Sequence, residues 1–454
     1  MRKKHEITTT QMIVFGFLAA IILGALLLSL PISSAEGKAT NIIDALFTST
    51  SATCVTGLVT VTTATHWSLF GKIVILILIQ FGGLGIVTFT TSLLLILRKR
   101  ITLKERMLIQ DAYNLDTLRG LVRLTIKILK GTLLIEAIGA FFYAIQFVPE
   151  YGFIKGIGCA IFNSVSAFCN AGMDVIGVNS LVPYVTNPLI NINTMMLIII
   201  GGIGFPVWWD ILRLTKMKFK EKVKLRTIFR KMELHTKVAL TMTAILIVGG
   251  AIAVFLLEYN NPNSIGNLNV GEKMMASTFQ SVTTRTAGFE TIPQKNFTDS
   301  SNFLFIILMF IGGSPSGTAG GIKTVTAVVI LMSVWSSIKN RQDVEMFNRK
   351  ITDSFVKKSV AVFGVSLIVL FTSMFALSIA QKAPFLDVIF ESTSAIGTVG
   401  LSRGFTGSLN NIGKLIIIIT MYLGRIGPIT MMLAFNSRKK INGRKLPTDK
   451  ILVG

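Results

Sequence analysis

The stretch Thr48-Ser49-Thr50-Ser51-Ala52-Thr53-Cys54-Val55-Thr56-Gly57-Leu58 is too polar for a lipid-facing helix and too apolar for an ordinary loop. Three related stretches follow it: Phe168-Cys169-Asn170-Ala171-Gly172-Met173, Arg285-Thr286-Ala287-Gly288-Phe289 and Gly397-Thr398-Val399-Gly400-Leu401. Their glycines, Gly57, Gly172, Gly288 and Gly400, recur about every 115 residues, and such a regular separation predicts a chain built from four repeats.

The composition is that of a polytopic membrane protein. Of 454 residues, 51% are hydrophobic and only 15% are charged. A membrane span needs roughly 18 or more apolar residues. Eight spans are predicted, two in each repeat, centred on residues 11–30, 73–97, 133–148, 189–212, 238–257, 303–334, 360–380 and 415–435.

The positive charge is distributed in a way that indicates a topology. The formal net charge is +23, and basic residues cluster at 2–4, 98–130, 213–237, 339–358 and 438–450, which are alternate connections between the spans. Lysine and arginine are retained on the cytoplasmic side of a membrane, so both termini are predicted to be cytoplasmic. Basic loops beside spans are topology signals or lipid contacts, and this pattern disfavours nucleic acid as a partner.

Within each repeat, a span leads to a short helix, a polar segment that carries the glycine, and a second span. The short helices are predicted at 41–52, 156–168, 272–283 and 385–395, and they are too short to cross a bilayer. Irregular backbone at membrane depth must line a cavity or be buried in protein. Two crossings return the chain to its starting side, so the repeats are parallel. The sequence predicts an all-α fold of four span–pore-helix–span repeats, 1–110, 111–225, 226–345 and 346–454, around one central pore.

The four glycine segments have the composition of a cation filter. Helix carboxyl ends carry partial negative charge, and rings of backbone carbonyls can replace the hydration shell of a potassium ion. Glycine permits the dihedrals that turn such carbonyls inward. The alternative is four ordinary re-entrant turns with glycine for tight packing. The candidate ion-binding residues are Thr53, Cys54, Val55, Thr56, Gly57, Cys169, Asn170, Ala171, Gly172, Arg285, Thr286, Ala287, Gly288, Gly397, Thr398, Val399 and Gly400.

A second set of positions lies 25 to 30 residues after the four glycines. Repeats 1 to 3 carry Gly83, Gly202 and Gly313 there, and repeat 4 carries Arg425. A charged group inside a span costs at least about 2.5 kcal/mol and usually faces a cavity or a partner. Arg425 is therefore predicted to form an electrostatic barrier below the filter. The alternative is a structural arginine that pairs with a carboxylate such as Glu391 or Asp210.

Repeat 3 carries a glycine-rich run, residues 311–323, inside an apolar segment. Five glycines and a proline prevent a regular helix there. Gly321-Ile322-Lys323-Thr324 misses the spacing of a phosphate-binding loop, so nucleotide binding is disfavoured. A gating loop in the pore is predicted, and a kink for helix packing is the alternative. The candidate gate residues are Gly312, Gly313, Ser314, Gly317, Gly320, Gly321 and Lys323, with Arg425.

Other polar residues are assigned structural roles. Glu136, Glu258, Asp387 and Glu391 are predicted to be ties at the extracellular vestibule, with Arg285 or Arg403 as partners of the last two. The odd number of cysteines, Cys54, Cys159 and Cys169, predicts neither a disulfide framework nor a metal site. A multi-pass membrane enzyme is the alternative class, but the sequence has no convergent catalytic set, so no enzymatic activity is predicted.

These features together resemble the Trk, Ktr and HKT superfamily of potassium transporters, and most of all its KtrB branch, the membrane subunits of bacterial Ktr systems. The resemblance rests on Gly57, Gly172, Gly288 and Gly400, on Arg425 and on the loop at 312–321. It implies K⁺ uptake across the bacterial plasma membrane, with preference over Na⁺ from the glycine at 57.

The same resemblance implies partners and regulation. The family forms homodimers in the lipid bilayer, with one pore in each subunit, and can be stimulated by Na⁺. A separate KtrA-type cytoplasmic ring of RCK domains binds ATP or ADP, and the membrane chain itself binds no cofactor. The potassium-binding subunit of a Kdp-type pump is the alternative within the same fourfold plan.

Overall fold

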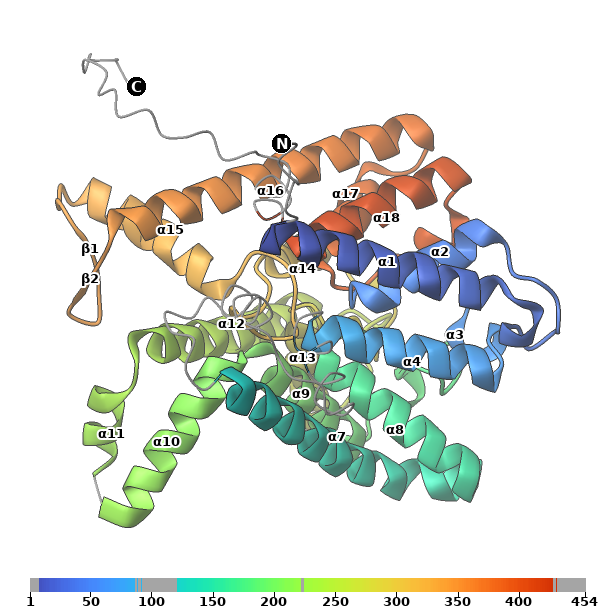
Figure 1. Ribbon diagram of the computed structural model, residues 1–454, viewed down its shortest axis with the longest axis horizontal. Helices are drawn as coiled ribbons and strands as arrows, with labels where there is room; N and C mark the ends of the chain where they lie inside the picture. Colours follow the sequence, from blue (N-terminus) through green and yellow to red (C-terminus); the bar gives the residue numbers. More distant parts are fainter. Residues whose placement is uncertain are drawn as a thin grey trace, which may run out of the picture.

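The computed structural model describes residues 8–85, 88, 91, 121–221, 224–427 and 430, and all elements below belong to these residues. Almost all of the regular structure is helical, and the only strands in this part of the chain form one hairpin. The helices fall into four successive groups, each with a long helix, a short helix and a second apolar helix or pair of helices (Figure 1). This is the order predicted for the four repeats.

Each repeat begins with a long apolar helix: α1 (Thr9–Ser29), α7 (Leu121–Tyr151), α12 (Leu234–Glu258) and α16 (Asp353–Ala380). Among the described residues, these four are long and apolar enough to cross a membrane. The first helix of repeat 2 continues past the predicted span 133–148, because Pro149 lies inside α7. A proline in the last turn removes one hydrogen bond without ending the helix at once.

The short helices are α2 (Ile42–Thr53), α8 (Phe153–Cys169), α13 (Val270–Thr283) and α17 (Phe385–Gly397). Asn41 caps the first of them, and its side-chain oxygen accepts a hydrogen bond from the N–H of Ile43 at 2.9 Å. A capping box between Asn269 and Glu272 starts the third. These caps satisfy backbone N–H groups that no helical carbonyl can reach. All four helices end roughly one turn before a repeat glycine.

The second helices differ from one repeat to the next. Repeats 1 and 4 have single helices, α4 (Leu69–Leu84) and α18 (Asn411–Ile426), and the remainder of both predicted spans lies largely outside the described residues. In repeat 2, the predicted single span is two helices, α9 (Pro188–Gly202) and α10 (Phe205–Glu221), bent by 99°. The bend follows from Gly204, whose φ is +91°, and from Pro206, which lacks an N–H.

In repeat 3 the second span is interrupted, as the glycine-rich run predicts. The helix α14 (Asp299–Phe310) ends, a loop follows, and α15 (Thr324–Ile338) continues the chain. The ends of this loop are held side by side, because the N–H of Gly312 donates to the carbonyl of Ile322 at 2.9 Å. The break is therefore an ordered excursion of the chain rather than a kink.

Two of the smaller features, a hairpin and a short helix, lie at one end of the molecule. The hairpin of β1 (Val344–Met346) and β2 (Arg349–Ile351) and the short helix α11 (Leu225–Lys231) lie at the same end as the outer parts of α10 and α15 (Figure 1). Further short elements are α3 (Thr63–His66) and the 3₁₀ turns Pro31–Ser33, Val182–Tyr184, Gln294–Asn296 and Thr406–Ser408.

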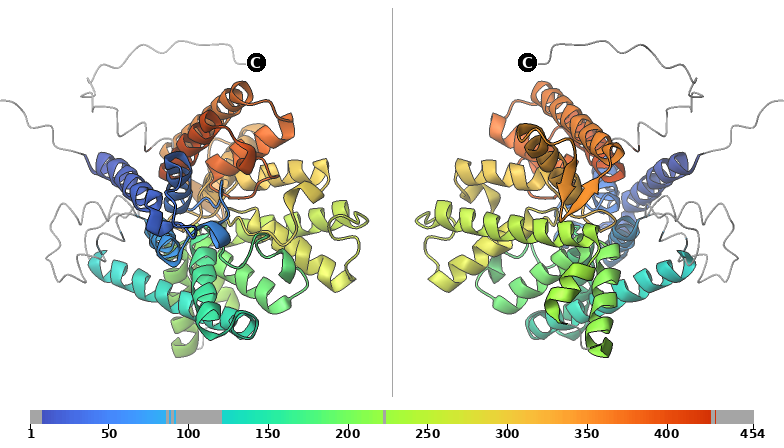
Figure 2. Two further views of the ribbon diagram at one scale, coloured as in Figure 1. Left: turned by 90° about the vertical axis from the view of Figure 1, so that its right-hand side faces the viewer. Right: turned by 90° about the vertical axis from the view of Figure 1, so that its left-hand side faces the viewer.

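The repeats pack in a closed cycle. Each second helix contacts the short helix of the next repeat: α4 contacts α8, α9 contacts α13, α14 contacts α17, and α18 contacts α2. The last contact closes the cycle between repeat 4 and repeat 1, and an ion pair of 2.6 Å between Lys414 and Asp44 joins the same two helices. The views along the molecule show the helices arranged around a common centre (Figure 2).

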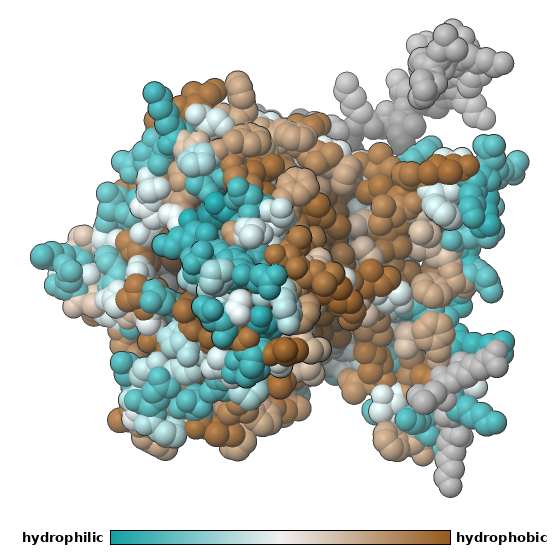
Figure 3. All heavy atoms as spheres, turned by 180° about the vertical axis from the view of Figure 1, so that it is seen from behind, coloured by the Kyte–Doolittle hydropathy of each residue, from teal (hydrophilic) through white to brown (hydrophobic). Residues whose placement is uncertain are grey.

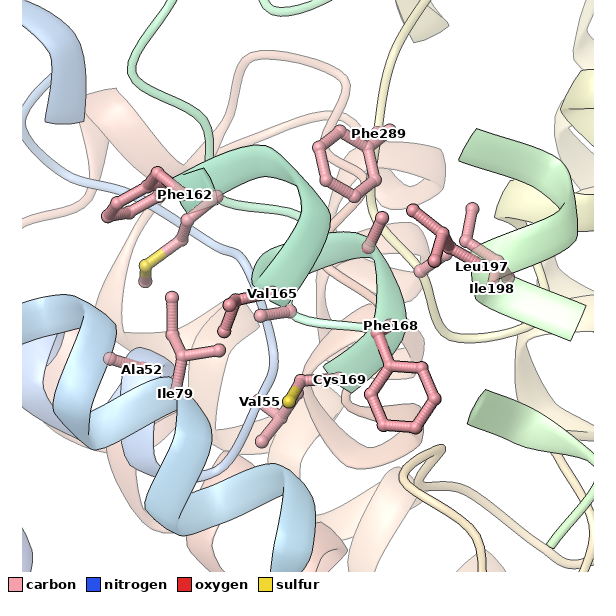
Figure 4. Close-up of a cluster of buried hydrophobic side chains, with 14 of the residues drawn as sticks. Ala52, Val55, Ile79, Phe162, Val165, Phe168, Cys169, Leu197, Ile198 and Phe289 are labelled. Atoms are coloured by element: carbon pink, nitrogen blue, oxygen red, sulfur yellow. The ribbon is translucent and has the colours of Figure 1, made fainter. Parts of the chain in front are cut away.

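The outer surface and the interior differ in polarity. On the face shown in Figure 3, apolar side chains gather between two hydrophilic regions, as expected for a protein embedded in a bilayer. The long helices carry exposed apolar side chains such as Leu23, Leu256 and Phe375. Inside, the largest buried cluster joins repeats 1 and 2 around α8, where Figure 4 shows Val55 close to Cys169.

Candidate ion pathway

The four repeat glycines meet in one place. We define the glycine ring as Gly57, Gly172, Gly288 and Gly400. A Cβ added to Gly57 would lie 2.5 Å from the carbonyl oxygen of Ala171, and one on Gly172 would lie 2.6 Å from that of Ala287. One on Gly288 would lie 2.5 Å from the oxygen of Val399, and one on Gly400 would lie 2.3 Å from that of Thr56. Each glycine thus faces the carbonyl that precedes the next glycine, in the order of the chain, and the ring closes.

The backbone of the four segments follows one pattern. The residue two positions before each glycine also has a positive φ: Val55 at 55°, Asn170 at 60°, Thr286 at 69° and Thr398 at 49°. Positive φ is costly for β-branched residues and persists only where the surroundings enforce it. In an ordinary extended strand, successive carbonyls point to opposite sides. The alternating sign of φ in these segments turns the carbonyls out of that pattern. The segments share this shape although their sequences differ.

Hydroxyl groups from the short helices hold the segments in this shape. Ser51 Oγ accepts a hydrogen bond from the N–H of Gly57 at 3.0 Å, and Ser394 Oγ accepts one from the N–H of Gly400 at 3.1 Å. In repeat 3, Thr283 Oγ1 donates to the carbonyl of Phe289 at 2.7 Å. Serine and threonine in these polar helices therefore support the backbone around the ring.

Some hydroxyls in the segments have no protein partner. Thr56, Thr286 and Thr398 are fully buried, and the side-chain oxygen of each makes no hydrogen bond within the described part of the chain. A buried polar atom without a partner is costly, unless a ligand or water satisfies it. These oxygens, together with the ring carbonyls, are ligands of the kind that a desolvated alkali cation accepts.

The loop of repeat 3, residues 311–323, lies against the segments on the side that precedes the glycines. We call it the glycine-rich loop. A Cβ on Gly320 would meet the Thr398 hydroxyl, so the loop touches the segment of repeat 4 directly. Thr318 Oγ1 donates to the carbonyl of Phe168 at 3.0 Å, which joins the loop to repeat 2. The loop therefore extends beneath the ring from one repeat to another.

The bend in repeat 2 holds the same loop. The N–H of Ser314 donates to the carbonyl of Gly202 at 2.9 Å, and the N–H of Phe205 donates to the carbonyl of Ser316 at 3.1 Å. A carbonyl at the end of α9 and an N–H at the start of α10 thus bond to the loop, which satisfies these backbone groups at membrane depth.

Arg425 lies beside the loop, and it pairs with neither Asp210 nor Glu391, the carboxylates named as alternatives. Its guanidinium donates to the carbonyl of Thr318 in the loop and to that of Gly82 in α4. Asp210 instead pairs with Arg213 at 2.6 Å, and Glu391 accepts hydrogen bonds from Ser402 and Thr406. Arg425 therefore connects repeats 4, 3 and 1 beneath the ring.

Comparisons with known proteins agree with this architecture. A family model described as "Cation transport protein" and named TrkH matches residues 3–443. The chain is 41% identical to the Ktr system potassium uptake protein B of Bacillus subtilis, over 98% of this chain and 97% of that protein. It is also 38% identical to the potassium/sodium uptake protein NtpJ of Enterococcus hirae, over 100% of this chain and 99% of that one.

The chain belongs to the TrkH family of cation transport proteins. The crystal structure of the potassium transporter TrkH from Vibrio parahaemolyticus matches with a TM-score of 0.72 and 17% identity, over 96% of this chain and 87% of that one. The predicted all-α membrane fold is thereby confirmed as a TrkH-like fold. Membership of a transporter family gives no support to the enzyme alternative, and the relatives give none to the Kdp-type alternative.

In this TrkH-family chain a cavity of about 430 Å³ lies on the other side of the ring, lined by the residues that follow the glycines. Two carboxylates, Asp174 and Glu290, line it, each two residues after a ring glycine. Burial raises the pKa of Asp174 to about 6. Burial also raises the pKa of Glu290 to about 8, and the negative charges of Asp174 and Glu391 act in the same direction.

The carboxylates singled out in the sequence have mixed outcomes. Asp387 pairs with Arg403 at 2.7 Å, as predicted, whereas Glu391 pairs with no arginine and accepts bonds from hydroxyls. Glu258 accepts bonds from Ser264, Thr298 and other groups near the end of α12, which is a structural tie. Among the described residues, none of these groups belongs to a cluster suited to a metal ion.

The prediction for Glu136 was wrong. This carboxylate lies not at the vestibule but in the middle of α7, beside the segment of repeat 2, where it accepts a hydrogen bond from Gln80 at 3.2 Å. Cys169, at the end of α8, lies 3.9 Å from it. Its position at the middle of a long helix, well away from either end, was a signal against the vestibule assignment.

Sequence reasoning missed Asp174 and Glu290. Their sequence position could have indicated them. Both lie two residues after a ring glycine, where the other repeats carry Val59 and Ser402. The three cysteines are free and buried, so no disulfide forms among them.

Proposed function

We propose that this chain is the membrane subunit of a Ktr-type potassium uptake system and that K⁺ crosses the bilayer through the glycine ring. The observation that carries the proposal is the closed cycle in which each ring glycine faces the carbonyl preceding the next one. Four carboxyl ends of short helices point partial negative charge at the same place, and both effects favour a desolvated cation. The names of the relatives, which include potassium uptake and potassium/sodium uptake, support K⁺ as the principal ion.

The glycine-rich loop and Arg425 form the gate in this proposal. The loop lies directly beneath the segments and touches Thr398, and the positive charge of Arg425 lies beside it. A cation leaving the ring meets both a steric obstacle and electrostatic repulsion. The gate residues are those named from the sequence, from Gly312 to Lys323, together with Arg425.

A cytoplasmic regulatory ring of the KtrA type, with RCK domains that bind ATP or ADP, controls this gate. The word "system" in the names of the Ktr relatives supports a separate partner subunit. The end of the molecule that holds α10, α11 and the β-hairpin (Figure 1) carries basic residues such as Lys218 and Arg230, and it is the surface that this ring contacts. In the bacterial plasma membrane that end faces the cytoplasm together with both termini, and two copies form a homodimer. Na⁺ stimulates uptake in the same complex.

The test is ⁸⁶Rb⁺ uptake by a potassium-uptake-deficient bacterium that expresses the chain with and without its partner. The Gly57→Ser variant introduces a side chain where a Cβ would lie 2.5 Å from the Ala171 carbonyl. We expect the preference for K⁺ over Na⁺ to fall by about an order of magnitude, equivalent to about 1.4 kcal/mol. Gly37→Ser is the matched control, because Gly37 also has a positive φ but no atom within 4 Å of an added Cβ. An unchanged preference in Gly57→Ser would refute the ring as the filter.

A further inference from the structure

Arg285 occupies a position that carries no charge in the other repeats. It lies three residues before Gly288, and the equivalent residues are Cys54, Cys169 and Gly397. Arg285 is only 7% exposed, and its guanidinium contacts Thr243 of α12 and the carbonyl of Gly312. A guanidinium buried at membrane depth is costly unless charge or hydrogen bonds compensate it.

The compensation for Arg285 is incomplete. Its Nη2 donates to the carbonyl of Gly312 and to Thr243 Oγ1, both at 3.4 Å, and its Nε has no partner. Within the described part of the chain, no carboxylate forms an ion pair with it. A small cavity of about 10 Å³, which is about the size of one water molecule, lies against the side chain.

Its main partner is the start of the glycine-rich loop. The helix α14 ends at Phe310, so the carbonyl of Gly312 points to no helical N–H and accepts from Arg285 instead. The same small cavity is lined by Gly313 of the loop and by Asn170 of the neighbouring segment. Arg285 therefore lies where two ring segments and the first residues of the loop meet.

We propose that Arg285 is a positioning residue that couples the ring segment of repeat 3 to the glycine-rich loop. A cation in the ring orders the backbone of 285–288, the guanidinium moves with that backbone, and its bond to Gly312 transmits the change to the loop. The inference rests on the proposed function, because it names how ion occupancy of the ring reaches the gate. Coupling of this kind is typically worth a fivefold or larger effect on the second site.

The test uses a cysteine at Ser316, a partly buried loop residue, in the full chain in native membranes. The native cysteines are buried, so a water-soluble thiol reagent reports on the loop. With Arg285 present, we expect replacement of Na⁺ by K⁺ to change the modification rate of Ser316→Cys by roughly fivefold or more. In Arg285→Met, which keeps similar length without donors, we expect the two rates to converge.

Arg285→Lys keeps the charge and one donor and should retain part of the K⁺ effect. Thr243→Val is the matched control, because it removes the other contact of Nη2 and leaves the bond to Gly312. Rates that still differ fivefold in Arg285→Met, or no K⁺ effect in the parent, would overturn the inference. If Arg285→Met does not fold, an unaltered K⁺ effect in Arg285→Gln overturns it. Normal ⁸⁶Rb⁺ uptake by the parent with such results would leave the proposed function intact.

Discussion

The second helices of repeats 1, 2 and 4 differ from that of repeat 3 in how they use the same glycine. A Cβ on Gly82, Gly201 or Gly424 would lie between 2.0 and 2.2 Å from a carbonyl of the short helix in its own repeat. Those carbonyls belong to Thr53, Phe168 and Ile396, each four residues before a ring glycine. In three repeats the glycine therefore allows two helices to touch immediately behind the ring.

In repeat 3 the equivalent glycine has a different neighbour. A Cβ on Gly312 would lie 2.1 Å from the carbonyl of Gly320, which belongs to the loop itself. The close contact with the short helix is lost, and Arg285 fills the region between the segment and the loop. The comparison teaches that one repeat has replaced the contact between two helices by an ordered loop, at the equivalent position of the sequence.

The largest expected effect is on the yield of folded protein. It distinguishes the glycines that pack against a short helix from Gly312, which packs against the loop. Gly82→Ala and Gly424→Ala place a methyl group against backbone that cannot move without displacing a short helix, and such overpacking costs about 1–3 kcal/mol or more. We expect each variant to lose most folded protein, measured by detergent-solubilised yield and thermal stability. Gly312→Ala strains only the loop and should keep the yield while changing uptake.

Gly249→Ala is the control for helix propensity, because no atom lies within 4 Å of an added Cβ there. We expect it to leave the thermal stability unchanged or slightly raised, since alanine favours a helix by about 1 kcal/mol over glycine. Equal losses of yield in Gly312→Ala and Gly82→Ala would contradict the comparison.

The next effect concerns Arg425, which joins the loop to repeats 4 and 1. Arg425→Ala removes a positive charge and its bonds to Thr318 and Gly82, so we expect faster ⁸⁶Rb⁺ uptake, by severalfold, with normal protein yield. Removal of hydrogen bonds to a charged group costs roughly 1.5–3 kcal/mol, which this loop contact can lose without unfolding the helices. Arg425→Lys should take up ⁸⁶Rb⁺ at a rate between those of the parent and of Arg425→Ala. If Arg425→Ala does not fold, the role of Arg425 is structural instead.

A smaller effect is expected from pH, through the cavity on the other side of the ring. Asp174 and Glu290 have pKa values raised to about 6 and about 8, so both lose protons as the external pH rises through this range. Added negative charge attracts K⁺, so the apparent KM for uptake should fall between about pH 5.5 and pH 8.5, within a unit of those pKa values.

The same loss of protons lowers the stability of the folded state while it strengthens the attraction of K⁺. A carboxyl with a raised pKa binds its proton more tightly in the folded state, so its contribution to folding is greatest at low pH and declines as the pH rises. Asp174→Asn with Glu290→Gln should flatten the pH dependence of KM without changing the response to the partner subunit. A KM that falls equally with pH in that double variant would refute the role of the pair.

The smallest effect tests the closure of the cycle away from the loop. Lys414 and Asp44 join repeat 4 to repeat 1, and their side chains are 14% and 16% exposed. We expect Lys414→Met to lower the free energy of unfolding by about 1 kcal/mol, because a partly solvated pair contributes little. Thermal unfolding in detergent measures this change, and Lys38→Met, at an exposed pair, is the control. A loss as large as that of Gly82→Ala would show that this pair holds the cycle closed.

The sequence by itself determined the four repeats, their short helices and the four glycines. Hydrophobic length and the cap at Asn41 are local signals, and the recurrence of glycine requires no knowledge of contacts. The glycine-rich run alone predicted a broken helix, because backbone preferences act within a few residues. The equivalence of Arg425 and Gly83 also came from the sequence, because both lie at a similar separation after a ring glycine.

Only the tertiary structure decided which groups meet. The bend between α9 and α10 has local causes in Gly204 and Pro206, but its contact with the glycine-rich loop, more than 100 residues later, comes from the folded cycle. The partners of Arg425 likewise come from two other repeats. Glu136 was misplaced because the predicted span began near it, at residue 133, whereas α7 begins at Leu121 and places it at mid-helix. Contacts between segments distant in the chain are fixed by packing of the whole cycle, and no local pattern encodes them.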